Sequence, residues 1–143
     1  MPTISRSALL PYPRESVYEI VSDVGRYPEF VPWCSSSEIL AQDELTVTAT
    51  LQFGAKGLRE TVTTRNTLVP VERIELNLVS GPFAEFLGIW HFAALGDGAG
   101  CKVQFDLDYR LAGRHLVLRP AFVGQAADKL VDAFAARCAA LLD

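Results

Sequence analysis

The stretch CKVQFDLDYRLA, residues 101–112, has the most regular hydrophobic pattern in the chain. Every second side chain is apolar, and the side chains between them are mostly polar or charged. The apolar set is Val103, Phe105, Leu107, Tyr109 and Leu111. Because successive side chains of a β-strand point to opposite faces of a sheet, this alternation predicts a strand with one buried and one solvated face. Such strands are typical of an antiparallel sheet that is covered on one side.

Similar period-two patterns precede this strand. We expect further strands at residues 3–10, 37–42, 45–53, 58–69, 73–80 and 84–95. Helical patterns occupy two other stretches. Residues 15–24, ESVYEIVSDV, favour a short helix, and apolar residues recur at helical spacing from about residue 120 to residue 142. The second helix is long, so its apolar stripe needs a large surface to cover it.

One curved antiparallel sheet wrapped around the C-terminal helix is the economical way to bury both apolar faces. We therefore expect an α+β fold with about six or seven strands, formed by residues 1–143 as a single domain. The chain contains no repeat and no low-complexity linker that would divide it. A wide sheet closed by one helix leaves interior space, and such a space is a natural site for a small apolar ligand.

Composition narrows the classes of partner. The net charge is −4, and no run of lysine or arginine is present. Because those side chains neutralise phosphates, the composition argues mildly against non-specific nucleic-acid binding, and we expect no DNA partner. The N-terminal sequence MPTISRSALL resembles neither a signal peptide nor a membrane-spanning segment. Three widely spaced cysteines favour free thiols in a reducing cytoplasm.

No residue pattern indicates catalysis or a metal site. His91 and His115 are isolated histidines without carboxylates at ligand spacing, so we expect no metal and no other cofactor. Cys34 has no base or cation beside it in the sequence, and packing in a turn is favoured over a nucleophilic role. Asp106 and Asp108 share one strand face and would suit acid–base chemistry, but charge pairing across a solvated sheet surface is favoured.

The remaining signal is hydrophobic. The stretch YPEFVPWC, residues 27–34, combines aromatic rings with two prolines, which forbid a regular helix or central strand. A second aromatic cluster, GPFAEFLGIW at residues 81–90, lies beside a turn, and Leu58 follows a glycine-containing loop. Most of these rings are expected in ordinary core. Apolar rings on connecting segments are nevertheless poorly explained by sheet packing, so we expect some of them, including Phe30, Val31 and Trp33, to face a ligand cavity.

Four segments resemble, in order, the coenzyme Q-binding START-like family. They are residues 1–34, GLRETVTTRNTL at residues 57–68, LVSGPFAEFLGIWHF at residues 78–92, and VDAFAARC at residues 131–138. The resemblance covers essentially the whole chain. It implies a helix-grip fold, in which a curved sheet encloses a long C-terminal helix and an apolar tunnel lies between them.

The resemblance also implies function. It implies non-catalytic binding of ubiquinone or another apolar lipid, which would support quinone delivery in respiration, with transient membrane contact. For some bacterial members it implies a second activity, a ribosome-associated toxin that binds the large ribosomal subunit and blocks subunit association. A polyketide cyclase or dehydratase activity, known in the wider superfamily, ranks last because the expected interior is apolar. The expected location is the cytoplasm, with a peripheral position at the inner membrane as the alternative.

The resemblance places residues 27–34 at the tunnel mouth and adds Arg65 of the TTRNTL segment. The full set of expected ligand contacts is Tyr27, Pro28, Phe30, Val31, Trp33, Phe53, Leu58, Arg65, Phe83, Phe86, Leu87, Trp90, Phe122, Leu130 and Phe134. Arg65, Lys56 and Tyr27 remain alternatives for a hydrogen bond to a quinone carbonyl. The candidates for a basic ribosome-binding patch are Arg59, Arg65, Arg73, Arg110, Arg114 and Arg119.

Overall fold

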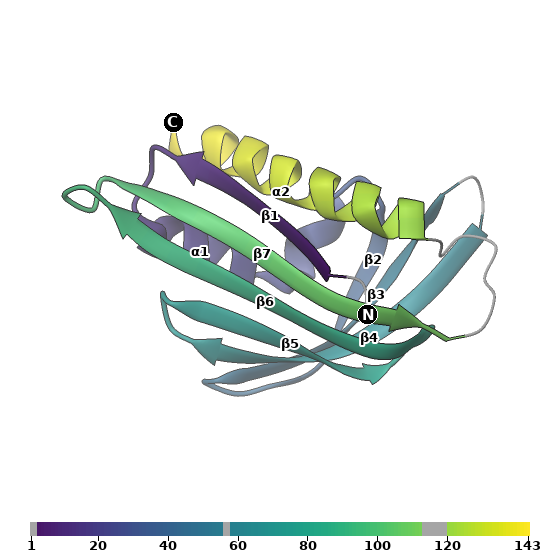
Figure 1. The fold of residues 1–143 in the computed structure, drawn as a ribbon. Coiled ribbons are helices and arrows are strands. Elements are labelled where there is room, and N and C mark those ends of the chain that lie inside the picture. The colour runs from purple at the N-terminus through teal and green to yellow at the C-terminus, as the bar shows by residue number, and fades with distance from the viewer. Residues whose placement is uncertain (1–2, 56–57, 113–119) are drawn as a thin grey trace.

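The computed structural model describes residues 3–55, 58–112 and 120–143 (Figure 1). Its elements in chain order are β1 (Thr3–Leu10), α1 (Arg14–Ser22), the 3-10 helix η1 (Val24–Glu29), β2 (Cys34–Gln42), β3 (Thr46–Ala55), β4 (Leu58–Val69), β5 (Arg73–Ser80), β6 (Phe83–Leu95), β7 (Gly100–Leu111) and α2 (Pro120–Leu142). The expected strands and both expected helices are therefore confirmed, with boundaries that differ by a few residues.

The strands form one seven-stranded sheet in the order β1-β7-β6-β5-β4-β3-β2, and every neighbouring pair is antiparallel. Figure 1 shows the sheet bending around α2, while α1 and η1 lie at one end of the enclosed space. The N-terminal strand closes the order by pairing with the last strand, and Ile4 lies opposite Leu107. This is the helix-grip arrangement expected from the sequence.

The alternating stretch at residues 101–112 becomes β7, which lies between the edge strand β1 and β6. Its apolar side chains point inward: Val103, Phe105, Leu107 and Tyr109 are all buried. Lys102 and Arg110 are exposed on the outer face. The inner face of the sheet and the apolar stripe of α2 therefore share one hydrophobic core.

One glycine sets how closely the core rings approach the sheet. Gly88 lies opposite Leu107 in the β6–β7 ladder. A Cβ atom at this position would lie 3.3 Å from a ring carbon of Phe105. The absent side chain leaves room for that ring, which packs against Trp90 with 4.6 Å between ring centroids. Gly88 therefore helps to position two of the rings that face the interior.

The proline-rich stretch at residues 27–34 differs from expectation at its start. We predicted no regular helix there, but Tyr27, Pro28 and Glu29 form the end of η1, so this part of the prediction is wrong. A proline is tolerated because η1 is a short 3-10 helix, in which its missing N–H removes a single hydrogen bond. The Tyr27 carbonyl ends the helix by accepting hydrogen bonds from the backbone N–H groups of Phe30 and Val31.

Candidate functional site

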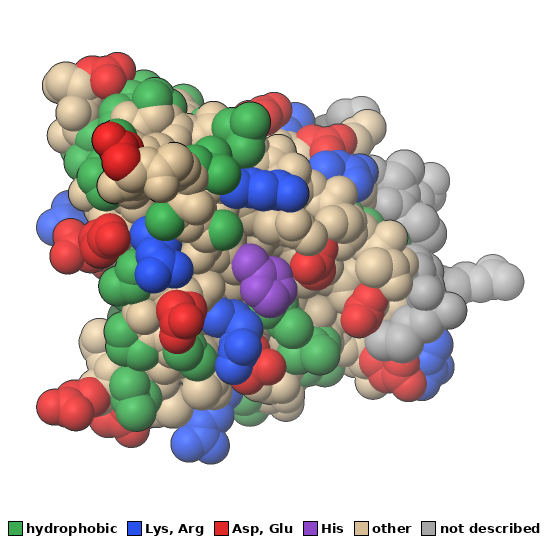
Figure 2. Space-filling view, turned by 60° about the vertical axis from the view of Figure 1, so that its left-hand side comes forward, with side chains coloured by type: hydrophobic (Ala, Val, Ile, Leu, Met, Phe, Trp, Pro, Cys, Tyr) green, Lys and Arg blue, Asp and Glu red, His purple; other side chains and the backbone are tan. Residues whose placement is uncertain are grey.

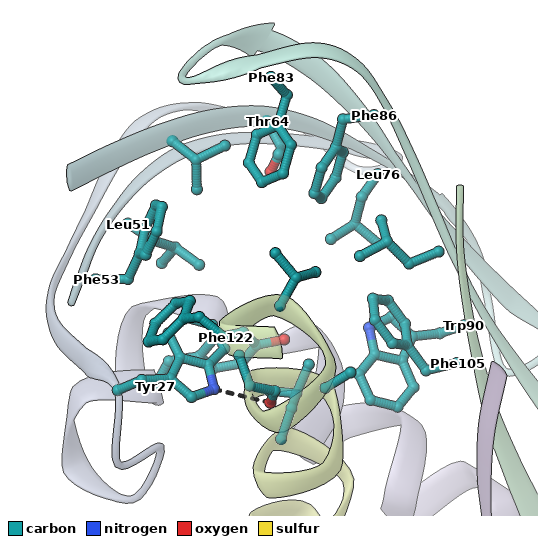
Figure 3. A pocket seen from close by; sticks show the side chains of 17 residues that line it. Tyr27, Leu51, Phe53, Thr64, Leu76, Phe83, Phe86, Trp90, Phe105 and Phe122 are labelled. Carbon is teal, nitrogen blue, oxygen red and sulfur yellow. Dashed lines mark hydrogen bonds between the residues drawn. The ribbon is translucent and has the colours of Figure 1, made fainter. Parts of the chain in front are cut away.

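An apolar cavity lies between the inner face of the sheet and the N-terminal half of α2. Its empty volume, with the solvent at its open mouth included, is about 780 Å³. The described residues that line it are Tyr27, Trp33, Leu51, Phe53, Val62, Thr64, Leu76, Phe83, Phe86, Trp90, Phe105, Leu107, Phe122, Val123, Ala126, Ala127 and Leu130. Figure 3 shows these side chains converging on the cavity from the sheet, from η1 and from α2.

The polar atoms of these lining side chains bind other parts of the protein. The Tyr27 hydroxyl donates a hydrogen bond to the Val21 carbonyl of α1. The Trp33 indole Nε1 donates to the Ala126 carbonyl at 3.0 Å, which joins the segment after η1 to α2. Burial raises the pKa of Tyr27 far above its usual range, so its hydroxyl remains protonated. These groups therefore stabilise the walls.

Aromatic pairs hold the walls in place. Trp90 packs edge-on against Phe134 with 5.2 Å between ring centroids, and Phe83 packs against Phe86 at 5.0 Å. Such pairs contribute roughly 0.5–1.5 kcal/mol each beyond the burial of their surface. On the opposite side of the cavity Phe53 and Phe122 are stacked, which links the sheet to α2 (Figure 3). The cavity is thus lined by rings that already have protein partners.

The structure brings some of the expected contact residues together and places others elsewhere. Those that line the cavity are Tyr27, Trp33, Phe53, Phe83, Phe86, Trp90, Phe122 and Leu130. Those outside the lining are Pro28, Phe30, Val31, Arg65, Leu87 and Phe134. The side chain of Leu58, and all of Lys56, fall outside the described residues. The expected residues of η1, β6 and α2 therefore share one cavity, whereas the second group does not line it.

The residues outside the lining have physical reasons for their positions. Arg65 is exposed on β4, and its neighbours along the strand point inward, so its side chain lies on the opposite face from the cavity. Leu87 faces outward on β6 for the same reason, opposite Asp108. Pro28 is exposed on η1. Arg65 therefore provides no polar contact inside the cavity.

Phe30 and Val31 pack behind the wall of the cavity. The ring of Phe30 lies between Tyr27 and Phe134, with centroid distances of 6.0 and 5.2 Å. The guanidinium of Arg137 covers its other side at 4.9 Å from the ring centroid, and Phe30 lines a separate surface hollow between α1, η1 and α2. Val31 is only 2% exposed. The structure therefore does not place Phe30 and Val31 in the cavity lining, where the sequence led us to expect them.

Because Phe30 lies outside the cavity lining and Trp33 lies within it, we expect substitutions at these two residues to have different effects. Phe30→Ala should lower the free energy of unfolding by about 2–4 kcal/mol, because it removes a partly buried ring that packs against the core, and should leave the affinity for an apolar probe nearly unchanged. Trp33→Phe removes the hydrogen bond to Ala126 and part of the cavity wall, so it should weaken ligand binding several-fold while stability falls by about 1 kcal/mol. Urea unfolding and displacement of an apolar fluorescent probe would measure both quantities. Loss of affinity in Phe30→Ala at unchanged stability would contradict this assignment.

Several lining residues were not among the expected contacts. On the sheet they are Leu51, Val62, Thr64, Leu76, Phe105 and Leu107, and on α2 they are Val123, Ala126 and Ala127. The sheet residues occupy inward positions of strands whose alternation was recognised. The same alternation predicts these residues as part of the cavity wall, if the inward face of the sheet is taken to line the cavity as well as the core. The alanines carry no such signal, since a small residue on an apolar stripe is usually ordinary packing.

The candidate reactive groups that the structure describes lie outside the cavity lining. Asp106 and Asp108 lie on the outer face of β7, where they accept hydrogen bonds from the Ser5 and Thr3 hydroxyls at 2.6 and 2.7 Å. His91 lies 3.7 Å from Asp106 on the same face. His115 falls outside the described residues. Among the described residues, no group of three or more His, Cys, Asp or Glu side chains could hold a metal ion. No described helix is long and apolar enough to span a membrane.

The three cysteines are free and buried. Burial raises the pKa of Cys34 to about 11, so the thiolate that nucleophilic chemistry needs is nearly absent at neutral pH. Burial, with a smaller contribution from Cys101, raises the pKa of Cys138 to about 11 as well. Packing is therefore the role of Cys34 that the structure supports.

Because burial raises the pKa of the Cys34 and Cys138 thiols, we expect the protein to lose stability in alkaline solution. In the unfolded chain each thiol ionises near pH 9, whereas the folded state holds it protonated to about pH 11. Above pH 9 the unfolded state therefore binds fewer protons than the folded state, and stability falls as pH rises from 9 to 11. We expect a loss of up to about 2 kcal/mol per thiol. Urea midpoints at pH 7, 9 and 10.5 would measure it, and Cys138→Ala should show a smaller fall than the parent chain.

The fold and the apolar cavity define a helix-grip domain of the START-like class. The family described as polyketide cyclase / dehydrase and lipid transport matches residues 10–135. The chain belongs to this family and, within it, to the group of ribosome association toxins and coenzyme Q-binding proteins.

Relatives with curated names support this placement. The chain is 48% identical to ribosome association toxin RatA of Pseudomonas aeruginosa, over 94% of this chain and 93% of the relative. It is 39% identical to RatA of Escherichia coli, over 96% and 87%. A mitochondrial coenzyme Q-binding protein, COQ10 homolog B of Xenopus laevis, is 26% identical over 91% of this chain and 55% of the relative.

Solved structures show the same fold at lower identity. The Zhui aromatase/cyclase from Streptomyces sp. R1128 superimposes with a TM-score of 0.88 at 19% identity, covering 99% of this chain and 96% of the other. A START superfamily protein from Mycobacterium smegmatis gives a TM-score of 0.82 at 22% identity, covering 97% and 98%. These likenesses establish the architecture alone, because the fold hosts several activities.

Proposed function

We propose that this chain is a non-catalytic binding protein that holds an elongated apolar ligand in the cavity. The observation that carries the proposal is the lining, in which aromatic and aliphatic side chains surround an apolar space between the sheet and α2. Catalysis would need polar groups that converge on a substrate. The polar side-chain atoms described in the lining instead bind Val21, Asn66 and Ala126 of the protein itself.

Ubiquinone or a similar isoprenoid lipid is the ligand class that we propose. The family description includes lipid transport, and one relative is named a coenzyme Q-binding protein. Burial of each five-carbon isoprene unit would contribute roughly 3–4 kcal/mol at about 0.8 kcal/mol per methylene, as an upper estimate. A few buried units would therefore give micromolar affinity after the cost of ordering the ligand.

Co-purification tests this proposal directly. The purified protein should release an isoprenoid lipid into organic solvent, and mass spectrometry would identify it. Protein that emerges without ligand should take up added ubiquinone with a short tail, which tryptophan quenching would follow, because Trp33 and Trp90 line the cavity. Protein that neither carries a lipid nor takes one up would exclude the proposal.

A second candidate function is association with the ribosome, and the relatives favour it over quinone delivery as the cellular role. Two relatives at 48% and 39% identity are named ribosome association toxins, whereas the coenzyme Q-binding relative is more distant. Binding to the large ribosomal subunit would block its association with the small subunit. It would also place the protein in the cytoplasm.

The structure describes part of the proposed basic surface. Arg59, Arg65, Arg73 and Arg110 are exposed and lie on the outer face of the sheet. Arg114 and Arg119 fall outside the described residues. Arg110 is paired with Glu85 at 3.5 Å. Acidic and basic side chains are interspersed on the face shown in Figure 2, so charge supports ribosome binding less strongly than the relatives do.

Ribosome profiles test the second candidate. Overproduction should increase free ribosomal subunits in sucrose gradients, and Arg65→Glu should reduce that increase because it reverses a charge on the outer sheet face. Lys129→Glu is the matched control, since Lys129 is exposed on α2. Profiles that overproduction leaves unchanged would exclude ribosome association without affecting the ligand-binding proposal.

A further inference from the structure

Thr64 and Asn66 are polar side chains in an otherwise apolar interior. Both lie on β4 and are separated by one residue, so they share the inner face of the sheet. Thr64 is 6% exposed and lines the cavity, and Asn66 is 8% exposed beside it. Figure 3 shows Thr64 on the sheet side of the cavity, across from Phe122 and α2. This Thr64–Asn66 pair is therefore placed where a ligand would contact the sheet.

The two side chains form one hydrogen bond with a defined direction. The Thr64 hydroxyl donates to Asn66 Oδ1 at 2.8 Å. A threonine hydroxyl has a single proton and two lone pairs, so Thr64 Oγ1 retains its acceptor capacity while its proton is engaged. A ligand group that meets Thr64 must then donate a hydrogen bond.

Neither of the other polar side chains in the lining offers this acceptor. The Trp33 indole has a donor only, and that donor already binds the Ala126 carbonyl. The Tyr27 hydroxyl is bound to the Val21 carbonyl of α1, so it lies against the helix instead of the sheet wall. Among the described lining residues, Thr64 is thus the side chain with an acceptor available on the sheet side of the cavity.

Folding alone does not explain the Thr64–Asn66 pair. Replacing both partners of a buried hydrogen bond by apolar groups of similar shape is often neutral or stabilising. Valine at position 64 would match the apolar wall formed by Val62 and Leu76. A polar pair in an apolar ligand cavity is the usual arrangement by which a site fixes the orientation of a ligand.

We propose that Thr64, positioned by Asn66, recognises a hydroxyl group on an otherwise apolar ligand. This inference rests on the proposed ligand-binding function and adds the chemistry of the ligand's polar group. An isoprenoid alcohol or the reduced quinol form of a quinone presents such a hydroxyl. An oxidised quinone presents carbonyl acceptors only, which leaves Thr64 Oγ1 without a donor.

A pair of ligands that differ only in this group provides the test. The probes are a thirteen-carbon methyl ketone and the secondary alcohol obtained by reducing it, which have the same number of heavy atoms. Each would displace the apolar fluorophore N-phenyl-1-naphthylamine from the full chain. The parent protein should bind the alcohol about three- to tenfold more tightly than the ketone, as expected for one neutral hydrogen bond. In Thr64→Val the two affinities should become equal, with ketone binding unchanged.

Two further variants separate recognition from general structure. Thr63→Val is the matched control, because Thr63 is also buried and its hydroxyl bonds Thr50 Oγ1 at 2.7 Å on the other face of the sheet. It should keep the preference for the alcohol. Asn66→Ala releases the Thr64 proton, so binding of the ketone should strengthen, which a purely structural role of Asn66 would not produce.

The outcomes distinguish this inference from the function on which it rests. Equal binding of alcohol and ketone by the parent chain, or an equal loss of both in Thr64→Val, would overturn hydroxyl recognition while leaving apolar ligand binding intact. Failure of the fluorophore and of both ligands to bind would overturn the ligand-binding function and the inference together.

Discussion

Trp90→Ala is expected to lower the free energy of unfolding by about 3–5 kcal/mol, the range measured for removal of a large aromatic side chain from a packed core. Trp90 is 2% exposed on the inner face of β6. Its ring packs against Phe105 of β7 and Phe134 of α2, with centroid distances of 4.6 and 5.2 Å. The substitution therefore breaks contacts within the sheet and between the sheet and the helix. The void it leaves joins the existing cavity, so neighbouring side chains cannot collapse to fill it.

Urea unfolding followed by far-ultraviolet circular dichroism would measure this loss. His91→Ala is the matched control, because His91 is the next residue on the same strand and its side chain is 48% exposed on the outer face. We expect that control to change stability by less than about 0.5 kcal/mol. A loss below about 1.5 kcal/mol in Trp90→Ala would mean that the sheet and α2 do not depend on this ring.

Most of the fold could be predicted because its signals are local. The alternation in β7 and the helical spacing in α2 each require one face to be buried, and one sheet around one helix satisfies both. The helix η1 was not predicted, because the local sequence gives no distinctive signal for it. Pro28 excludes a regular α-helix, but a short 3-10 helix makes fewer demands on the backbone, and hydrophobic pattern does not distinguish it from irregular chain.

The candidate site could be predicted only in part, because a cavity depends on what side chains fail to fill. Trp33 and Phe86 could be proposed from rings beside irregular segments, and both line the cavity. Phe30 has the same local features but is covered by Phe134 and Arg137, two residues more than a hundred positions later in the chain. Contacts at such separation leave no trace in local sequence, so the structure was needed to separate wall from core.

The small residues of α2 explain why space remains between the sheet and the helix. Ala126 and Ala127 line the cavity, while larger side chains of the same helix, such as Phe134, fill the interior further along. A methyl group at these two positions cannot reach the opposite wall, where Leu76 and Thr64 lie (Figure 3). Ala126 and Ala127 therefore leave this part of the cavity open, and a larger side chain at either position should fill it.

Ala126→Phe is accordingly expected to weaken ligand binding by about a hundredfold with little change in stability. Ala126 is half-buried and borders the cavity, so the new ring would enter empty space without displacing core atoms. The ring would exclude about one five-carbon unit of an isoprenoid ligand, whose burial contributes roughly 3–4 kcal/mol at most. Displacement of the apolar fluorophore would measure affinity, and thermal unfolding would measure stability.

Ala136→Phe is the matched control for this prediction, because it makes the same change on the solvent-exposed face of the same helix. It should leave ligand affinity unchanged. The cavity-filling variant also separates the two proposed functions, since a ribosome would contact surface side chains that Ala126→Phe does not alter. We expect ribosome association to persist in this variant while ligand binding is lost. Unchanged ligand affinity in a folded Ala126→Phe protein would show that the ligand binds elsewhere, and the assignment of the cavity would then be wrong.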